Sequence, residues 1–138
     1  MTAFRKLNDG WNADPNVPEP SIKLLEGNLL LTFAPNYFRY DEYENVAALT
    51  LVFHNCVQYR IGPTNDEGWY RGQCRFSKIA PEWGEFYEVS GDLLLSDLDQ
   101  CWTPASLVTP DNINHYLFYF RDDTFECDAE SWSKNIVT

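Results

Sequence analysis

The stretch HYLFYFRDDTFECDAESW, residues 115–132, carries the clearest fold signal in this chain. Residues 116–120 are all apolar, so a strand there has two apolar faces and is predicted to be central and covered on both sides. The polar residues RDDT then favour a turn. Beyond the turn, apolar and acidic side chains alternate strictly, which predicts a second, half-buried strand. The stretch therefore predicts a β-hairpin of the core.

In the second strand of this hairpin, alternation assigns each side chain to one face of the sheet. The side chains predicted to point inward are Phe125, Cys127 and Ala129. Those predicted to point outward are Glu126, Asp128 and Glu130. A row of like charge along a strand is typical of a solvated face or of a guard against edge pairing. We therefore expect the three acids to lie together on an exposed surface.

Other segments also show strand periodicity. Residues 21–33 contain two alternating apolar runs separated by the turn residues EGN, which predicts another hairpin. The longest alternation covers residues 48–61 and is interrupted at Asn55, which marks a bulge or bend that splits it into two strands. Within it, Leu49, Leu51, Phe53, Val57, Tyr59 and Ile61 are predicted to share one apolar face. Further strand-like pieces lie at residues 37–43, 69–79 and 85–90.

These patterns together predict an all-β fold. About nine or ten short strands are joined by short turns without helical crossovers, so the pairing is expected to be mainly antiparallel. Such a sheet must curl or fold over to cover its apolar face, which gives a barrel-like sheet or a sandwich. We predict one domain over residues 1–138, with an irregular N-terminal arm at 1–20 and an antiparallel body at 21–132. The spacing of Phe4, Leu7 and Trp11 allows at most one short helical turn in the arm.

Composition and cysteine usage indicate the compartment. No apolar run approaches the roughly 20 residues that span a bilayer, and the N-terminus lacks a signal-peptide pattern, so we expect a cytoplasmic chain without membrane contact. The cysteines are Cys56, Cys74, Cys101 and Cys127. Without a C-x-x-C pair or an export signal they are predicted to be reduced thiols, mostly buried, with two disulfides as the alternative. Neither His54 nor His115 stands in ligand spacing with them, so no metal site is predicted.

The net charge of −11 bears on partners. A field of this sign repels phosphate backbones, which disfavours nucleic-acid binding. It favours solubility in general and, more specifically, attraction to a basic protein partner.

Catalytic signatures are absent from the sequence. There is no phosphate loop, G-x-G-x-x-G, H-E-x-x-H, EF-hand loop or G-x-S-x-G elbow, so no catalytic residue and no cofactor is predicted, and both histidines are expected to be structural. Residues 82–92 do bring several acids close to Trp83 and Tyr87. Carboxylates beside aromatic rings suggest glycoside chemistry or sugar binding, which needs two carboxyls at a controlled separation. Solvent-facing acids beside core aromatics are the simpler interpretation.

The candidate binding surface lies within residues 62–92. This segment combines tryptophan, tyrosine and arginine, which are enriched where proteins bind each other, with a run of acids. The alternative is that its tryptophans only cap the ends of a β-barrel. The candidate binding residues are Trp69, Arg71, Trp83, Glu85, Tyr87 and Glu88.

Four stretches of the chain resemble those of a group of small bacterial proteins. They are LNDGWNADPNVPEP at 7–20, GPTNDEGWYRGQCRFS at 62–77, WGEFYEVSGD at 83–92 and the stretch at 115–132. They resemble proteins encoded by mobile integron gene cassettes and in loci that contain immunity proteins. The resemblance implies a single-domain cytoplasmic protein that acts by binding, and it brings no catalytic residues with it.

Three hypotheses follow for function. The first is a non-enzymatic binding module, of the immunity type, that neutralises a basic protein. The second is a small-ligand-binding or hydrolytic β-barrel with a pocket lined by aromatic and acidic side chains. The third is a homodimer formed through a strand edge or an aromatic patch.

Overall fold

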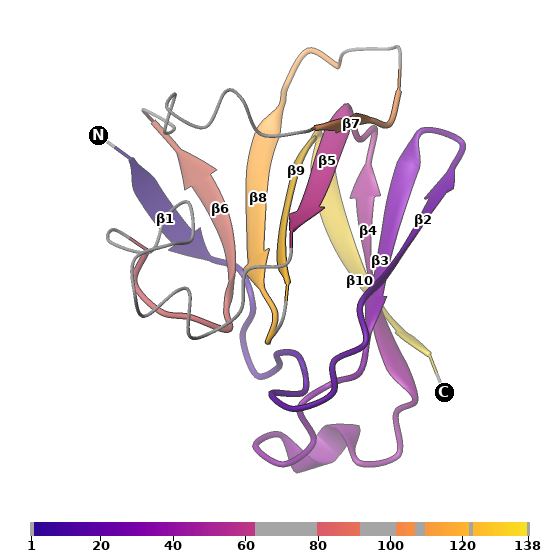
Figure 1. The fold of residues 1–138 in the computed structure, drawn as a ribbon, viewed down its shortest axis with the longest axis vertical. Helices are drawn as coiled ribbons and strands as arrows, with labels where there is room; N and C mark the ends of the chain where they lie inside the picture. Colours follow the sequence, from indigo (N-terminus) through magenta and orange to yellow (C-terminus); the bar gives the residue numbers. More distant parts are fainter. Residues whose placement is uncertain (1, 63–79, 92–101, 107–109, 122, 138) are drawn as a thin grey trace.

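The computed structural model describes residues 2–62, 80–91, 102–106, 110–121 and 123–137. Within these ranges ten β-strands form two antiparallel sheets of six and four strands (Figure 1). The prediction of an all-β, antiparallel fold is confirmed. Of the two architectures left open, the structure adopts the sandwich-like one, because the two sheets stay separate and do not close into a barrel.

The six-stranded sheet has the strand order β1-β6-β8-β9-β5-β7. Its strands are β1 (Ala3–Lys6), β5 (Gln58–Gly62), β6 (Phe86–Ser90), β7 (Thr103–Pro104), β8 (Asn114–Tyr119) and β9 (Thr124–Ala129). The predicted core hairpin is β8–β9, in which Tyr116 lies opposite Cys127 and Phe118 lies opposite Phe125. Leu117 on one face of β8 and Phe118 on the other are both fully buried, so the prediction of a central strand covered on both sides is confirmed.

The four-stranded sheet has the order β10-β4-β3-β2. Its strands are β2 (Ser21–Leu25), β3 (Asn28–Phe33), β4 (Ala48–His54) and β10 (Ser131–Val137). The predicted hairpin at 21–33 is β2–β3, and its two loop residues, Glu26 and Gly27, both have positive φ angles. Two such residues form the type of turn whose twist matches that of the flanking strands.

Asn55 is the point at which the chain passes from one sheet to the other. Its φ of 52° lies in the left-handed region, and its backbone N–H donates to Asn28 Oδ1 at 3.1 Å. The predicted split at Asn55 is confirmed, with β4 before it and β5 after it. Beyond this corner β5 belongs to the other sheet, but Tyr59 still packs against the same core as Leu49, Leu51 and Phe53. The predicted apolar face becomes incomplete only towards the end of β5, where Ile61 is 39% exposed.

The main core lies between the two sheets and is rich in aromatic rings. The four-stranded sheet contributes leucines and phenylalanines of β3 and β4, and the six-stranded sheet contributes Phe86, Tyr116 and Phe118. Ring centroids of Phe33 and Phe118 are 5.2 Å apart, so the sheets meet through direct ring contacts. A smaller cluster, which includes Tyr87, covers the opposite face of the six-stranded sheet. This sheet is therefore packed on both faces.

Three segments differ from their predictions. Within the arm, residues 3–6 form strand β1, which pairs with β6 and leaves no helical turn there. Residues 37–43 form a turn and the short 3-10 helix η1 (Asp41–Tyr43), because the backbone N–H of Tyr40 bonds to the Asn36 carbonyl. The final strand, β10, covers Ser131–Val137, whereas the predicted antiparallel body ended at residue 132.

The helical content of the described ranges is limited to η1, and no helix there is long and apolar enough to cross a membrane. Of the four cysteines, Cys56 and Cys127 are buried free thiols. Burial, followed by the neighbouring Cys56 side chain, holds the pKa of the Cys127 thiol well above its usual value. Cys74 and Cys101 lie outside the described residues.

Candidate functional site

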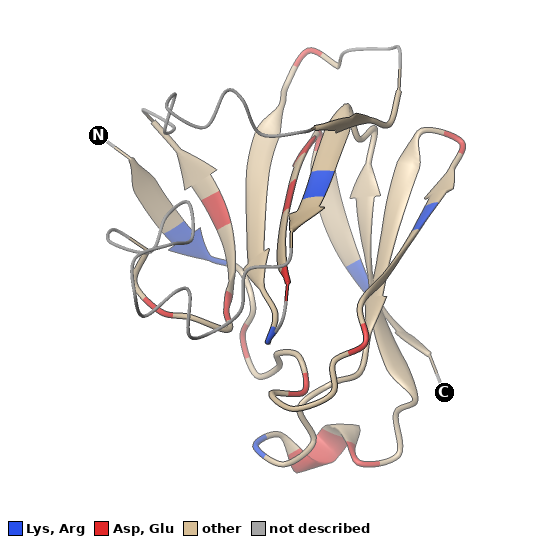
Figure 2. Cartoon of the chain, in the orientation of Figure 1, with Lys and Arg blue, Asp and Glu red and all other residues tan. Residues whose placement is uncertain are grey.

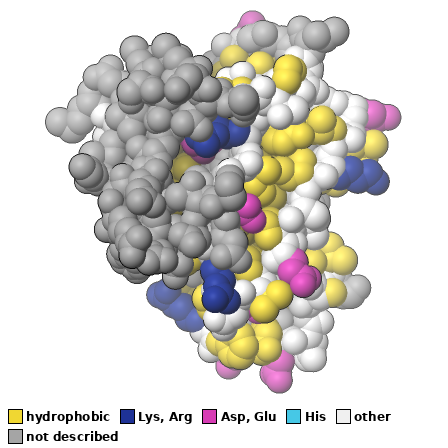
Figure 3. Space-filling view, in the orientation of Figure 1, with side chains coloured by type: hydrophobic (Ala, Val, Ile, Leu, Met, Phe, Trp, Pro, Cys, Tyr) yellow, Lys and Arg dark blue, Asp and Glu magenta, His cyan; other side chains and the backbone are white. Residues whose placement is uncertain are grey.

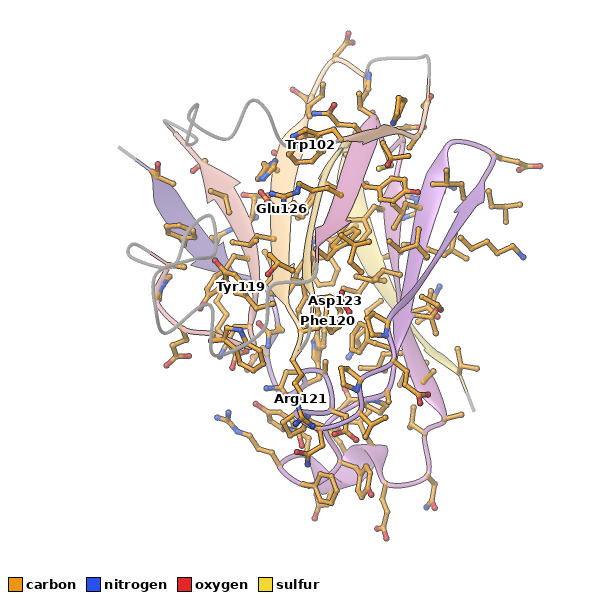
Figure 4. All side chains as sticks on the ribbon, viewed as in Figure 1. Trp102, Tyr119, Phe120, Arg121, Asp123 and Glu126 are labelled. Atoms are coloured by element: carbon orange, nitrogen blue, oxygen red, sulfur yellow. The ribbon has the colours of Figure 1, made fainter. Side chains whose placement is uncertain are left out.

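A row of polar side chains crosses the outer face of the six-stranded sheet, away from the main core. In the strand register, His115 of β8 lies opposite Asp128 of β9. On the other side of β9, Gln58 lies opposite Asp128 and Arg60 lies opposite Glu126. Because side chains alternate between faces, all five point to the same side of the sheet. We call these five residues the outer charge network; Figure 4 labels Glu126 within it.

The network is closed by short hydrogen bonds. His115 Nδ1 lies 2.7 Å from Asp128 Oδ1, and His115 Nε2 lies 2.7 Å from Glu126 Oε1. Arg60 Nη1 donates to Glu126 Oε2 at 3.0 Å, and Gln58 Nε2 donates to Asp128 Oδ2 at 2.8 Å. The edge of the Trp102 ring packs on the imidazole, with ring centroids 5.8 Å apart. Each carboxylate therefore has partners on both of its oxygens.

The prediction that the acids of β9 form an exposed row is wrong for Glu126. Its side chain is fully buried and the Asp128 side chain is 19% exposed, whereas Glu130 is exposed as predicted. The reason is the register: β8 and β5 place His115 and Arg60 on either side of Glu126. A carboxylate is buried only when cations and hydrogen bonds offset its lost hydration, and here both are present.

The same geometry fixes the protonation state of His115. Burial by itself lowers the pKa of the imidazole, but the hydrogen bonds to Asp128 and Glu126 more than reverse this effect and raise the pKa to about 9. At neutral pH both ring nitrogens thus carry protons and donate them to carboxylates. A general base needs a free nitrogen lone pair, which this imidazolium does not have. The network is therefore a largely buried cluster of ionised groups that are hydrogen-bonded to one another.

Two hollows lie near the sequence-predicted binding residues. A cleft of about 340 Å³ is lined by Glu88 and Ser90 of β6 and by the His115–Asp128 end of the outer charge network. A second hollow, of about 200 Å³, lies where the N-terminal arm meets the end of β8. We call the second one the arm pocket. Its polar and aromatic lining includes Asn12, Arg39, Trp83, Glu85, Tyr119 and Arg121. Tyr119 and Arg121 are labelled in Figure 4.

The structure does not gather the candidate binding residues at one place. Trp83 and Glu85 line the arm pocket, whereas Glu88 lines the cleft and pairs with Arg5 at 3.2 Å. Tyr87 lines neither hollow and is buried in the smaller hydrophobic cluster. Trp69 and Arg71 lie outside the described residues.

Glu85 and Tyr87 both have partners inside the protein. Glu85 is 4% exposed, accepts a hydrogen bond from Asn8 and lies 3.7 Å from Lys6 Nζ. The Tyr87 hydroxyl donates to the Glu82 carbonyl at 3.2 Å, and burial raises its pKa to about 12. Glu85 and Glu88 line different hollows, so they do not form the facing carboxyl pair that glycoside hydrolysis requires.

A third feature is an exposed aromatic pair at the end of the sandwich where β3 connects to β4. The rings of Tyr37 and Phe38 stack with centroids 4.3 Å apart, and the residues are 42% and 64% exposed. Asp41, Glu42 and Glu44 follow directly and are all exposed. Acidic residues of this segment stand at the lower end of the molecule in Figure 2, and hydrophobic and acidic side chains adjoin there in Figure 3. We call residues 37–44 the acidic aromatic end.

Sequence reasoning missed the outer charge network, although one signal for it was present. The backbone N–H of Phe120 bonds to the Asp123 carbonyl across the turn. If residues are counted outward from this pair along both strands, His115 falls opposite Asp128, which is the observed register. The partner on the other side, β5, lies far away in the sequence, and no local pattern identifies it. Asn12 was missed because an isolated asparagine in an irregular arm carries no periodicity.

Within the described ranges, no three His, Cys, Asp or Glu side chains are placed to hold a metal ion. In the outer charge network this follows from its closure, since both nitrogens of His115 already bond to carboxylates. Comparison of the chain with protein-family models, with curated proteins and with solved structures finds no match.

Proposed function

We propose that this chain is a non-enzymatic, cytoplasmic binding protein that uses the acidic aromatic end to bind a basic protein. The observation that carries the proposal is the combination of a stacked, exposed Tyr37–Phe38 pair with three adjacent exposed carboxylates. The resemblance to integron-cassette and immunity-type proteins points in the same direction, towards neutralisation of a basic toxin.

The aromatic pair has the properties of an interface anchor. Aromatic side chains bury a large area with few rotatable bonds, and they are frequent among the residues that dominate binding energy. Stacking of Tyr37 on Phe38 already restricts both rings, so less conformational entropy is lost when a partner covers them.

The charge around the pair favours a basic partner. Asp41, Glu42 and Glu44 form no ion pair with any described residue. The guanidinium of Arg39, the one cation of this segment, lies over the Tyr40 ring at 5.2 Å. With a net charge of −11 the whole chain also steers a cationic protein towards it over distances of about a Debye length.

Two alternatives are less favoured. A second copy of the chain would bring two charges of −11 together, so repulsion opposes a homodimer through this surface. The hydrolytic alternative gains no support from His115, whose two nitrogens both bond to carboxylates, or from Glu85 and Glu88, which line different hollows.

The proposal is tested by affinity capture from the lysate of the native host at low salt. The parent is compared with a Phe38→Ala, Glu42→Gln, Glu44→Gln variant. The matched control carries Leu25→Ala and Glu26→Gln at the β2–β3 turn, where an exposed apolar residue also adjoins an acid. We expect one basic protein to be retained by the parent and the control, lost by the triple variant and released by salt. Recovery of no specific protein, or equal recovery by all three chains, would overturn the proposal.

A further inference from the structure

Two residues that line the arm pocket, Asn12 and Trp83, each have a buried polar atom that the protein leaves without a hydrogen-bond partner. Among the described residues, Asn12 Oδ1 and Trp83 Nε1 are both buried and lack any partner. Asn12 is 9% exposed, and its backbone carbonyl is held by the Asn36 N–H at 2.9 Å, so the residue is fixed in place. Buried polar groups in folded proteins are nearly always satisfied by protein, water or ligand, and leaving them unpaired costs free energy.

We propose that the arm pocket binds a small neutral hydroxylated molecule, of the size of a single sugar ring. The first argument is hydrogen-bond chemistry. Asn12 Oδ1 needs a donor and the Trp83 N–H needs an acceptor, and a hydroxyl group supplies both.

The second argument is charge. The described pocket lining has two carboxylates, of Asp14 and Glu85, and two guanidinium groups, of Arg39 and Arg121. The Arg39 guanidinium lies over the Tyr40 ring. Glu85 is bonded to Asn8, Asp14 Oδ1 accepts the backbone N–H of Asn16 at 2.8 Å, and Arg121 Nη1 donates to the Asn16 carbonyl at 3.0 Å. The described lining thus carries equal numbers of positive and negative groups, and this balance favours a neutral ligand over an anion or a cation.

The third argument is size and shape. At about 200 Å³ the pocket is smaller than the roughly 300–1,000 Å³ of sites for drug-sized ligands. The rings of Trp83, Tyr119 and Phe120 line it beside the polar groups. Apolar ring surface combined with a few fixed hydrogen-bonding atoms suits the C–H face and the hydroxyls of a monosaccharide.

The test is a ¹H–¹⁵N NMR titration of the full chain with D-glucose, D-galactose and N-acetyl-D-glucosamine, and with glycine and sulfate as charged probes. We expect the Trp83 indole N–H and the Asn12 side-chain amide resonances to shift saturably with at least one sugar, and not with the charged probes. Trp83→Phe keeps an aromatic ring but removes the donor, and Asn12→Leu removes the acceptor at similar size. Each should weaken binding by about 5-fold, the equivalent of one hydrogen bond.

Trp102→Phe and Asn112→Ala are the matched controls, because neither residue lines the arm pocket, and both should bind as the parent does. Should Asn12→Leu fail to fold, the Trp83→Phe variant alone decides, since Trp83 is only partly buried. The inference is overturned if no neutral sugar gives a saturable shift, if glycine or sulfate shifts the same resonances, or if Trp83→Phe binds as tightly as the parent. It does not depend on the proposed protein partner, so either one can fail alone.

Discussion

The state of His115 makes a quantitative prediction about the pH dependence of stability. The pKa of His115 is about 9 in the folded protein, whereas an unfolded histidine titrates near 6.5. Because the folded pKa is raised, the stabilisation is fully present below pH 6.5 and is lost as the pH rises through about 9. Each unit of difference corresponds to about 1.4 kcal/mol, so the whole effect is about 3 kcal/mol.

The assay compares the parent with the His115→Gln variant by urea denaturation at several pH values from about 6 to about 9.5. The variant keeps a polar side chain but cannot carry the charge. We expect the difference in the free energy of unfolding between the two chains to shrink by about 3 kcal/mol across this range. Taking this difference removes the contribution of other groups, such as the Cys127 thiol, whose pKa is also raised by burial.

A difference that stays constant with pH would refute the reasoning. It would mean that the imidazole in the folded chain titrates as in the unfolded one, and that the two carboxylates do not hold it as a cation. A difference that widens as the pH rises would mean that His115 is buried in its neutral form.

Three further predictions concern single residues. Glu126→Gln removes the anion between two buried or half-buried cations and should lower the free energy of unfolding at neutral pH by about 3–5 kcal/mol in urea melts. Gly27→Ala should lower the free energy of unfolding by about 1–2 kcal/mol in the same assay, because the φ of Gly27 is 83°, a conformation that strains an alanine backbone. An added Cβ would meet no atom within 4 Å, so this backbone strain is the only expected cost. An unchanged urea midpoint would contradict this prediction. Phe38→Ala removes a side chain of a residue that is 64% exposed, so it should change the free energy of unfolding by no more than about 0.5 kcal/mol. Any loss of partner binding in this variant then reports on the surface itself. A large loss of stability would show instead that the ring is part of the core.

Local alternation predicted the parts of the fold that depend on neighbouring residues in sequence. In the hairpins β2–β3 and β8–β9, apolar runs of strand length stand on both sides of turn residues, and this pattern was enough to predict the strands. The split at Asn55 was also visible as a polar interruption. The change of sheet that follows Asn55 could not be predicted, because the sequence does not say which strand each half will pair with.

Features that depend on distant partners could not be predicted. Glu126 follows the outward alternation of β9, and only the positions of His115 and Arg60 on the adjacent strands turn that outward face into a buried one. β10 was missed because Lys134 occupies an inward position, where its Nζ donates to the Tyr43 hydroxyl and lies 5.3 Å from the Trp11 ring centroid. An inward lysine breaks the apolar alternation, even though the protein accommodates its charge with aromatic rings.

The candidate site was predicted only in fragments. Trp83 and Glu85 do line one hollow, but the residue that makes the arm pocket chemically distinctive, Asn12, comes from an irregular segment far away in the sequence. The acidic aromatic end was expected to be a strand-like piece. In its turn conformation, which exposes Phe38, the backbone N–H groups of Arg39 and Tyr40 donate hydrogen bonds to the side-chain and backbone oxygens of Asn36.

The proposed binding of a basic protein through the acidic aromatic end can be measured directly. The most direct test is the dissociation constant of the purified complex with the captured basic protein, measured by calorimetry at roughly 0.1 M and roughly 1 M salt, for the parent and for the Phe38→Ala, Glu42→Gln, Glu44→Gln variant. We predict a one-to-one complex that weakens with salt for the parent and a much weaker complex for the variant at low salt. A complex with the same affinity at both salt concentrations, or one that the variant forms as tightly as the parent, would contradict it.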